Sequence, residues 1–509
     1  MPAVPSASPR PAVSLGALAA ALDGVVVGSP EVTVSDVTQD SRRVAPGSLY
    51  AARRGLRSDG HAFAPDALAR GAAALLVEDA SLLHALNAPG VVVPRVNPVL
   101  GRAAQLVHGR PFDRLPVLGV TGTNGKTTTT NLAASILRAQ GARPALLGTL
   151  GCLFEEHDLG GSHTTPEADD IARLAARLLD LGASCLLMEV SSHALALGRV
   201  EDVPFQVAGF TNLSHDHLDF HGSMEAYGEA KARLFTELHP RSSVINVDDA
   251  FGSRLLPRAP GALGVSRLGD PRARLRASDA VSDAGGLRAV AHLDNRPFAL
   301  RSPLVGAHNL ENLLVAAGLA LAHGAEAAPV FAALPSIPPV PGRLERCSEA
   351  GDDLLVLVDY AHTPDALERV LAALRPLCAG RLWCVFGCGG DRDPHKRGPM
   401  GEAAARGADR LIVTNDNPRS EDPALIAEAI LAGVRAAGAT CEVELDRSLA
   451  IHRAIAAAAP GDVVLLAGKG HEPYQILGAV TRPFDDRAEA RRALASRRNP
   501  SQPTPGAPS

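Results

Sequence analysis

The sequence predicts an α/β protein of three domains: a small N-terminal α/β domain, a central P-loop ATPase-type domain with a mostly parallel sheet, and a C-terminal Rossmann-like doubly wound domain. Three observations support this fold class. The chain has 509 residues, enough for about three domains of ~150 residues each. An apolar segment runs into a glycine-rich loop within 117–130. After residue 350, apolar runs alternate with helical stretches, which is the pattern of βαβ units.

The N-terminal domain is expected at 12–112. Its short strand and helix candidates are 49–52, 65–70, 73–77 and 90–93. A composition break at 108–115 predicts a linker to the next domain. Residues 1–11 and 496–509 are rich in Pro and Ser, so both ends are expected to be disordered.

The central domain is expected at 113–340 and the C-terminal domain at 341–495. Apolar runs that predict buried, mostly parallel strands in the central domain are 185–190, 207–210 and 244–247. A proline-rich linker covers 335–342. In the last domain, strands are predicted at 354–359, 381–387, 410–414 and 463–467, with helices at 364–375 and 423–437. Ligands of such sheets bind beyond the carboxyl ends of the strands.

Composition argues against several classes of protein. The net charge is −5 and no long run carries one sign, which argues against nucleic-acid binding. No run approaches the ~18 apolar residues of a membrane-spanning helix, and the N-terminus lacks the apolar core of a signal peptide. The seven cysteines include no C-x-x-C pair, so we expect reduced thiols in a cytoplasmic protein.

The segment 117–130 has the layout of a phosphate-binding loop. Glycines let backbone N–H groups approach phosphates closely, and the following helix adds the positive end of its dipole. Lys126 is placed to reach the β- and γ-phosphates, and the Thr127 hydroxyl to ligate Mg²⁺. The strict G-x-x-x-x-G-K-[ST] pattern is not met, because Val120 stands where its first glycine belongs. The alternative is a glycine-rich turn with a chance lysine, which the flanking strand and helix disfavour.

Further polar residues follow the central strands. Glu189 ends an apolar run and is a candidate Mg²⁺ ligand, with a turn-capping role as the alternative. The segment 215–221 holds three His and two Asp residues, which favours a metal or phosphate site, with Asp216 and His217 as the strongest candidates. On a helix, Tyr227 and Lys231 share one face. Lys231 could pair with Glu189, contact phosphate, or be carboxylated by CO₂, and the ion pair is the simplest of these.

Charged residues of both signs follow the predicted strands of the last domain. They are Arg392, Asp416, Arg419, Lys469, His471 and Glu472. Gathered in one crevice, they would suit a zwitterionic substrate, with the cations holding a carboxylate and the acids an ammonium. The alternative, scattered loop charges, is weakened by their shared position at strand ends. In 306–312, His308, Asn309 and Asn312 could face a purine or could cap the following helix equally well.

Eight motifs in this order resemble those of the Mur ligases, ATP-dependent enzymes that add amino acids during peptidoglycan synthesis. The motifs are GTNGKTT (122–128), TTPEA (164–168), MEVSSHAL (188–195), DHLDFH (216–221), HNLEN (308–312), GRLE (342–345), DYAHTPDAL (359–367) and DNPR (416–419). The resemblance covers about 30–492 and is greatest to the members that add diaminopimelate. It implies that the first domain binds the UDP end of the substrate, the second ATP and the third the incoming amino acid.

The resemblance also implies residue roles. ATP is expected at Gly122, Thr123, Asn124, Gly125, Lys126, Thr127, Thr128, Asn309, Arg343 and Asp359. UDP-N-acetylmuramoyl-L-alanyl-D-glutamate is expected at Ser41, Thr164, Thr165, Ser191 and Arg199. meso-Diaminopimelate is expected at Arg392, Asp416, Asn417, Pro418, Arg419, Gly468 and Glu472. Mg²⁺ is expected at Thr127, Glu189, His217 and Lys231, the last as N6-carboxylysine. Lys126, Lys231 and His217 are the expected catalytic residues of an enzyme that we expect to be a monomer.

Two positions depart from the family pattern: His163 stands where Asn is common, and Leu197 where some members have Gln. The DNPR arginine, Arg419, can hold the second carboxylate that diaminopimelate has and lysine lacks. Three alternatives remain: the lysine-adding ligase, folylpolyglutamate synthetase, and a P-loop ATPase that drives conformational change without synthesis.

Overall fold

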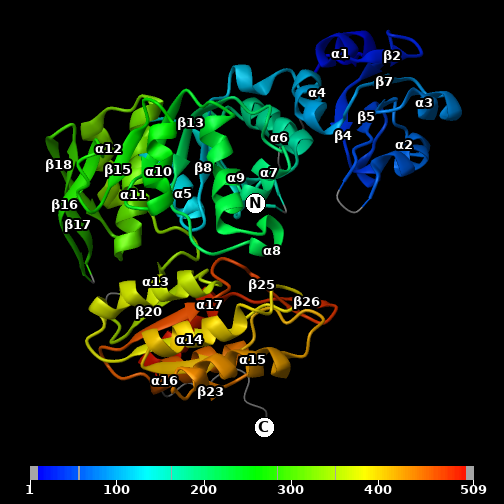
Figure 1. Cartoon of the computed structure of the whole chain (residues 1–509). Coiled ribbons are helices and arrows are strands. Elements are labelled where there is room, and N and C mark those ends of the chain that lie inside the picture. Colours follow the sequence, from blue (N-terminus) through cyan, green and yellow to red (C-terminus); the bar gives the residue numbers. More distant parts are fainter. Residues whose placement is uncertain (1–9, 56–57, 162, 284, 350, 500–509) are drawn as a thin grey trace. The chain divides into compact units, whose positions relative to one another are not determined.

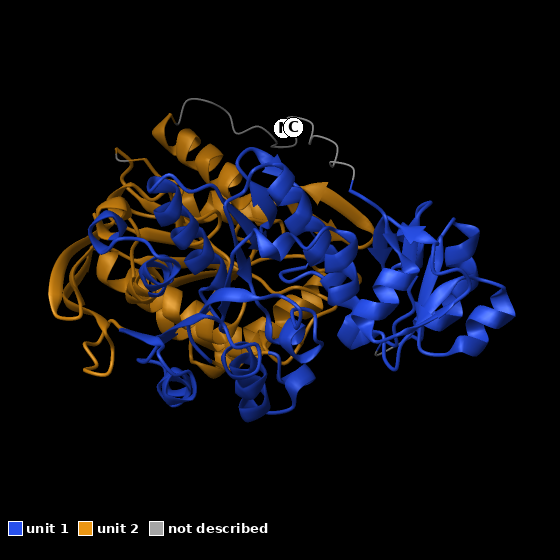
Figure 2. Ribbon diagram, turned by 90° about the horizontal axis from the view of Figure 1, so that it is seen from above, with its two compact units in different colours: residues 1–213, 217–265, 315–330 blue, residues 214–216, 266–314, 331–509 orange. Residues whose placement is uncertain are grey.

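The computed structural model describes residues 10–55, 58–161, 163–283, 285–349 and 351–499. Figure 1 labels many of its helices and strands. The chain divides into two compact units, which Figure 2 colours separately. Unit 1 comprises the residues up to 213, 217–265 and 315–330, and unit 2 comprises 214–216, 266–314 and the residues from 331 onward. Each unit is described by itself.

Unit 1 begins with a small α/β domain. Its sheet runs in the order β2 (Val25–Val27), β7 (Gly90–Val92), β6 (Ala74–Val77), β5 (Ser48–Ala51) and β4 (Asp36–Thr38), and all neighbours are parallel except β2 and β7. The helices are α1 (Leu15–Leu22), α2 (Ala64–Ala69), α3 (Ala80–Leu86) and α4 (Leu100–Val107), and β1 (Val13–Ser14) pairs with β3 (Thr33–Val34). The strand and helix candidates predicted in this domain are confirmed.

The second part of unit 1 is a mostly parallel sheet. Its strands lie in the order β11 (His157–Asp158), β10 (Gly151–Phe154), β9 (Pro144–Gly148), β12 (Cys185–Glu189), β8 (Val117–Thr121), β13 (Phe205–Phe210), β14 (Ser242–Asn246) and β15 (Leu263–Ser266). From β9 to β15 all neighbours are parallel. Strands β8 and β12 are buried along their whole length, as expected of strands covered on both faces.

Helices connect these strands. They are α5 (Lys126–Ala139), α6 (Ala168–Asp180), α7 (Ser192–Ala196), α8 (Leu218–His221), α9 (Met224–Thr236) and α10 (Ala250–Leu255). Helices α11 (Ala307–His323) and α12 (Ala327–Ala333) each have residues in both units. The close packing of α11 on the sheet uses a glycine, since a Cβ on Gly209 of β13 would lie 3.2 Å from Leu319.

Unit 2 contains the doubly wound sheet that the sequence predicts. Its order is β19 (Glu345–Arg346), β20 (Leu355–Asp359), β24 (Val463–Ala467), β21 (Leu382–Phe386), β22 (Arg410–Val413) and β23 (Glu442–Val443), and only β19 is antiparallel to its neighbour. One core cluster joins the sheet to α13 (Pro364–Leu374), α14 (Arg397–Gly407) and α15 (Pro423–Ala436). A second cluster joins it to α16 (Arg447–Ala457) and α17 (Asp486–Arg498). Helices therefore cover both faces.

Two β elements of unit 2 are absent from the sequence prediction. One is the antiparallel meander β16 (Leu275–Asp283), β17 (Gly286–Leu293) and β18 (Arg296–Ser302). The other is the hairpin β25 (Tyr474–Leu477) and β26 (Val480–Pro483). Their strands mix polar and apolar side chains, so neither appears as an apolar run.

The two predicted linkers are packed connections. In 108–115, Phe112 and Leu115 belong to the central core cluster. In 335–342, Ile337 and Val340 are buried. Burial of these apolar side chains offsets the conformational entropy lost when a connection is held in one conformation.

The predicted disorder at the two ends is partly wrong. Helix α17 continues to Arg498, and its last arginines pair with acidic residues: Arg497 with Asp353 at 2.7 Å and Arg498 with Asp352 at 2.5 Å. At the other end, Arg10 donates to the Ala176 carbonyl and pairs with Asp180 at 2.8 Å. These ion pairs hold residues that composition alone assigns to the tails. Residues 1–9 and 500–509 lie outside the described residues.

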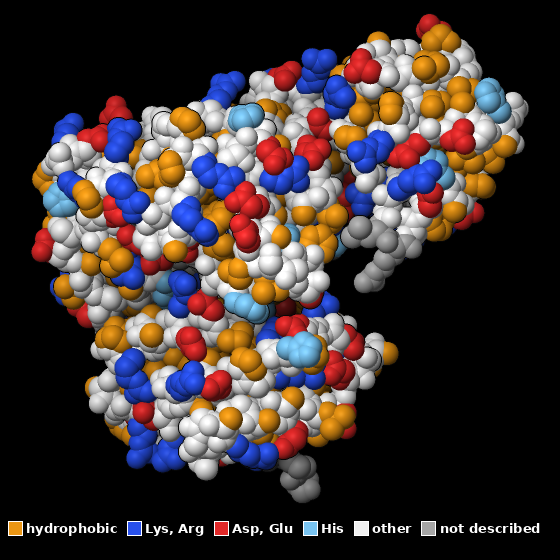
Figure 3. Space-filling model, viewed as in Figure 1, with side chains coloured by type: hydrophobic (Ala, Val, Ile, Leu, Met, Phe, Trp, Pro, Cys, Tyr) orange, Lys and Arg blue, Asp and Glu red, His pale blue; other side chains and the backbone are white. Residues whose placement is uncertain are grey.

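Two general features bear on function. No described helix is long and apolar enough to cross a membrane. Basic and acidic side chains are interspersed on the face shown in Figure 3, with neither sign dominating a large area. This mixture fits the absence of a long single-sign run in the sequence.

Candidate active site

The phosphate loop lies between β8 and α5, where the sequence predicts it. A Cβ on Gly122 would lie 1.9 Å from the Thr211 hydroxyl oxygen, so only glycine fits there. Gly125, just before α5, has a φ of +85°, which other residues rarely adopt. Lys126 Nζ donates to the carbonyl oxygens of Gly122 and Thr123, each at 2.9 Å. The lysine thus lies over its own loop, where an anionic ligand of the backbone N–H groups would meet it.

Glu189 lies at the end of β12, beside this loop. Its Oε1 accepts from the Thr127 hydroxyl at 2.9 Å and from the Thr149 N–H at 2.8 Å, and its Oε2 accepts from the Thr149 hydroxyl at 3.1 Å. Glu189 is 2% exposed. A Cβ on Gly148 would lie 2.2 Å from Oε1, so this glycine makes room for the carboxylate. A buried carboxylate and a threonine hydroxyl are hard oxygen donors, and this pair fits Mg²⁺.

Lys231 reaches the same loop from α9. It is 1% exposed, and its Nζ donates to the Gly122 carbonyl at 2.8 Å and lies 4.4 Å from the centre of the Tyr227 ring. The Tyr227 hydroxyl is 3.1 Å from that of Thr123. The predicted shared face of Tyr227 and Lys231 is confirmed, and it faces the phosphate loop.

Two histidines of 215–221, His217 and His221, lie beside His193. The His193 ring lies 4.8 Å from that of His217 and 5.5 Å from that of His221. Burial, followed by repulsion from His217 and His221, lowers the pKa of His193 to about 4. Among the described residues, no group of three or more His, Cys, Asp or Glu side chains is arranged to hold a metal ion. Asp216, a candidate from the sequence, belongs to unit 2.

Four residues expected to bind the muramoyl dipeptide lie close together in unit 1. The Thr165 hydroxyl donates to the Glu189 carbonyl at 2.9 Å and accepts from the Ser191 N–H at 3.0 Å. Thr164 and Thr149 hydroxyls are 3.2 Å apart. Arg199 donates to the Thr165 carbonyl at 3.1 Å. The Thr165 hydrogen bond therefore links this group to Glu189.

The sequence interpretation missed Glu167, which orients Arg199. Its two carboxylate oxygens pair with Arg199 and with Arg53, each at 2.8 Å. Ser41, expected near the uridine, begins a short 3₁₀ helix (Ser41–Arg43). The last residue of that helix, Arg43, pairs with Asp170 of α6 at 2.8 Å. The Arg53–Glu167 and Arg43–Asp170 pairs join the small N-terminal domain to the start of α6.

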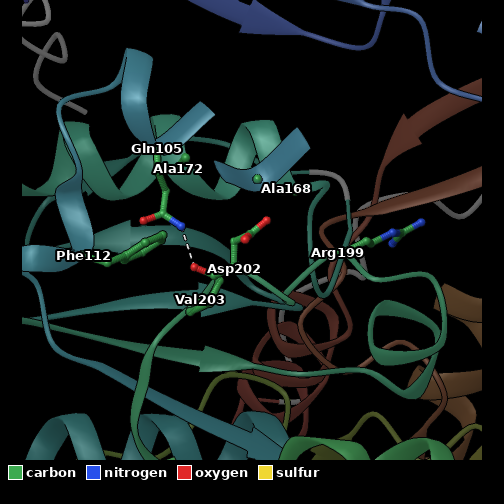
Figure 4. A pocket seen from close by; sticks show the side chains of 8 residues that line it. Gln105, Phe112, Ala168, Ala172, Arg199, Asp202 and Val203 are labelled. Carbon is green, nitrogen blue, oxygen red and sulfur yellow. Dashed lines mark hydrogen bonds between the residues drawn. The ribbon is translucent and has the colours of Figure 1, made fainter. Parts of the chain in front are cut away.

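A small cavity lies beside this region, lined by Gly101, Gln105, Phe112, Ala168, Ala172, Arg199, Asp202 and Val203 (Figure 4). The Gln105 amide donates to the Asp202 carbonyl oxygen across it. Burial raises the pKa of the Asp202 carboxyl, although the Arg102 N–H and guanidinium lower it. The cavity shares Arg199 with the dipeptide group and does not include the phosphate loop.

Three expected ATP residues belong to unit 2, whereas the phosphate loop belongs to unit 1. Asn309, in the first turn of α11, donates to the Val305 carbonyl at 2.8 Å. Asp359 accepts from the N–H groups of Leu344 and Ala361, each at 2.8 Å. Burial raises the pKa of Asp359, against the opposing effect of Arg343. Arg343 itself lies over the Tyr360 ring, 4.6 Å from its centre.

At the strand ends of unit 2, Lys469, Asn417 and Glu472 form one hydrogen-bonded network. The Asn417 amide donates to Glu472 at 2.8 Å, and Lys469 Nζ lies 3.1 Å from the Asn417 amide oxygen and 3.3 Å from Glu472. Lys469 is fully buried. Lys469 is one of the charged residues predicted to line the crevice but is not among those expected to bind diaminopimelate, and it lies at the centre of that group. Arg419 donates to the Gly390 carbonyl at 2.7 Å.

Glycines allow the loops that carry this network to pack closely. A Cβ on Gly468 would lie 2.6 Å from Asp416, and one on Gly390 would lie 1.9 Å from the Pro418 carbonyl oxygen. A Cβ on Gly389 would lie 3.0 Å from the Arg419 guanidinium and 3.7 Å from Arg392. All seven residues expected to bind the amino acid therefore lie on loops that are in contact.

Comparison with known proteins covers nearly the whole chain. Residues 33–108 match the Mur ligase family catalytic domain, 120–320 the Mur ligase middle domain, and 342–470 the Mur ligase glutamate ligase domain. A relative from Synechococcus elongatus is named UDP-N-acetylmuramoyl-L-alanyl-D-glutamate–2,6-diaminopimelate ligase. It is 46% identical over 477 residues, covering 92% of this chain and 95% of the relative.

Two further matches carry the same name. One, from Gloeobacter violaceus, is 45% identical over 471 residues and covers 92% of this chain and 96% of the relative. The other is a solved structure that is 35% identical, has a TM-score of 0.67, and covers 93% of this chain and 97% of that one.

Proposed function

The chain belongs to the Mur ligase family of ATP-dependent, amide-forming ligases, and we propose that it adds meso-diaminopimelate to UDP-N-acetylmuramoyl-L-alanyl-D-glutamate. The observation that carries the choice of amino acid is Arg419, the last residue of DNPR, which lies two residues after Asn417 of the Lys469–Asn417–Glu472 network. A guanidinium can hold the carboxylate that distinguishes diaminopimelate from lysine. The names of the relatives support the same substrates.

In the proposed reaction, the γ-carboxylate of the D-Glu residue attacks the γ-phosphorus of ATP. ADP leaves and an acyl phosphate forms. The neutral amine of diaminopimelate then attacks the acyl carbon, and the tetrahedral intermediate collapses to the amide and inorganic phosphate. Lys126 offsets the negative charge that builds up as two anions approach each other. Thr164, Thr165, Ser191 and Arg199 orient the dipeptide carboxylate beside the phosphate loop.

Mg²⁺ is part of the proposal. Thr127 and Glu189 would hold one ion, which would neutralise charge on the phosphates. His217 and Lys231 would support a second, with Lys231 carboxylated on Nζ. The support for Lys231 is its complete burial and its 2.8 Å contact with the phosphate loop. The free state of all seven cysteines supports a reducing compartment, and we propose a cytoplasmic monomer.

The experiment compares phosphate release and product mass for wild type, Lys126→Ala and Arg138→Ala. Each protein receives ATP, Mg²⁺, the UDP-muramoyl dipeptide and meso-diaminopimelate. Arg138 is an exposed residue near the end of the same helix, α5, and its variant is the matched control. We expect the tripeptide product from wild type and Arg138→Ala and none from Lys126→Ala. Phosphate release by wild type without the dipeptide would favour a plain ATPase instead.

A further inference from the structure

A fully buried ion pair lies behind the amino-acid network of unit 2. Arg447, the first residue of α16, and Asp486, the first residue of α17, are both 0% exposed. The contact is bidentate: Arg447 Nε donates to Asp486 Oδ1 at 2.7 Å and Nη2 donates to Oδ2 at 2.6 Å. Neither residue is part of any motif that the sequence interpretation used.

Arg447 also bonds to the ends of two strands. Its Nη2 donates to the carbonyl of Ala467, the last residue of β24, at 2.9 Å. Its Nη1 donates to the carbonyl of Asn415, which follows β22, at 3.2 Å. The residues that come next are Asp416 and Gly468, both in the proposed diaminopimelate site. Strands β22 and β24 do not pair with each other, because β21 lies between them.

The pair is hard to explain as a device for stability. Replacing a buried ion pair with apolar residues is often neutral or stabilising, because desolvation of both charges opposes their attraction. Arg447 also lies at the N-terminus of its helix, where the dipole disfavours a cation. Burial lowers the pKa of Arg447, but Asp486, Asp416 and Glu472 together raise it above its ordinary value. The field of the guanidinium therefore extends to the site.

We propose that Arg447 and Asp486 are positioning residues that set the distance between the Asp416 loop and the Gly468–Glu472 loop, and so determine the affinity for the incoming amino acid. Asp486 fixes the plane of the guanidinium, and the guanidinium holds both strand ends. The loop after β21 cannot set the distance between these two loops, because it is rich in glycine. It packs on its neighbours through Gly387, Gly389 and Gly390. This inference rests on the proposed function for the identity of the amino acid.

The test uses the double variant Arg447→Met/Asp486→Leu, which replaces the ion pair with an apolar pair of similar size, and Arg447→Lys, which keeps the charge but loses the planar fork. The control is Trp383→Phe. It removes a buried hydrogen bond, 2.9 Å from the indole nitrogen to Asp462, at the amino ends of β21 and β24 in the same sheet. Thermal unfolding and the KM of each of the three substrates are measured for every variant.

We expect both Arg447 variants to be folded, with KM for diaminopimelate raised about tenfold or more, since a loop displaced by even 1 Å can cost that much. KM for ATP and for the dipeptide should stay at wild-type values, and Trp383→Phe should leave all three unchanged. A folded variant with an unchanged KM for the amino acid would overturn the inference, as would an equal rise in all three KM values. If wild type uses lysine rather than diaminopimelate, the proposed substrate is wrong, and KM for lysine tests the pair in the same way.

Discussion

Replacing Gly148 with alanine should disable catalysis through a steric effect on Glu189. The added Cβ would lie 2.2 Å from Glu189 Oε1 and 2.7 Å from Cδ and Cγ, whereas real Cβ contacts are essentially never under 3.0 Å. Going from 2.2 to 3.0 Å requires a shift of about 0.8 Å, and Oε1 is the atom that accepts from Thr127 and Thr149. A displacement of this size next to the phosphates should lower kcat on the order of 100-fold.

The assay follows phosphate release as a function of Mg²⁺ concentration, together with thermal unfolding. Gly148→Ala should be folded, with a loss of about 1–3 kcal/mol from overpacking, and should need more Mg²⁺ for half-maximal activity. Gly351→Ala is the matched control, because a Cβ there meets nothing within 4 Å. A folded Gly148→Ala variant with a kcat and Mg²⁺ requirement like those of wild type would refute the assignment of Glu189 as a cation ligand.

Two further predictions concern specificity and pH. Arg419→Met should raise KM for diaminopimelate by tenfold or more, because a charge-assisted hydrogen bond is worth about 1.5–3 kcal/mol, with little change in activity toward lysine; an unchanged preference between the two amino acids would contradict the role of Arg419. Burial raises the pKa of the Asp169 carboxyl from 3.8 to about 6. The stability that the protonated carboxyl contributes to the fold is therefore complete below about pH 4 and is lost as pH rises through 6. Asp169→Asn should therefore gain stability relative to wild type between pH 4 and 6, on the order of 2–3 kcal/mol, in chemical unfolding at each pH. A difference in unfolding free energy between Asp169→Asn and wild type that does not vary with pH would contradict this prediction.

Much of the architecture could be predicted because the signals are local. The strand before Gly122, the helix that begins at Lys126 and the buried run that ends at Glu189 each depend on neighbours in sequence. Parallel strands covered on both faces form short apolar runs, which is why the doubly wound sheet of unit 2 was found. The polar residues that follow those runs lie together because the carboxyl ends of parallel strands share one edge.

The features that the sequence did not reveal depend on contacts between distant segments. Arg447 and Asp486 are 39 positions apart and start two ordinary helices, so neither has a local signature. Glu167 stood inside a recognised motif, but its bridge to Arg53 spans 114 positions. Gly148 is one glycine among 48, and only the position of the Glu189 carboxylate shows why it cannot be larger. The meander β16–β18 was missed because its polar residues obscure the alternation of polar and apolar side chains that indicates a strand.

The most direct test of the proposed reaction is phosphate release by the purified protein given ATP, Mg²⁺ and the UDP-muramoyl dipeptide, with meso-diaminopimelate or L-lysine added in parallel. The account predicts release that depends on the dipeptide and occurs with diaminopimelate but not with lysine. Release with lysine alone would contradict the role of DNPR, and release that requires neither amino acid nor dipeptide would contradict the ligase reaction itself.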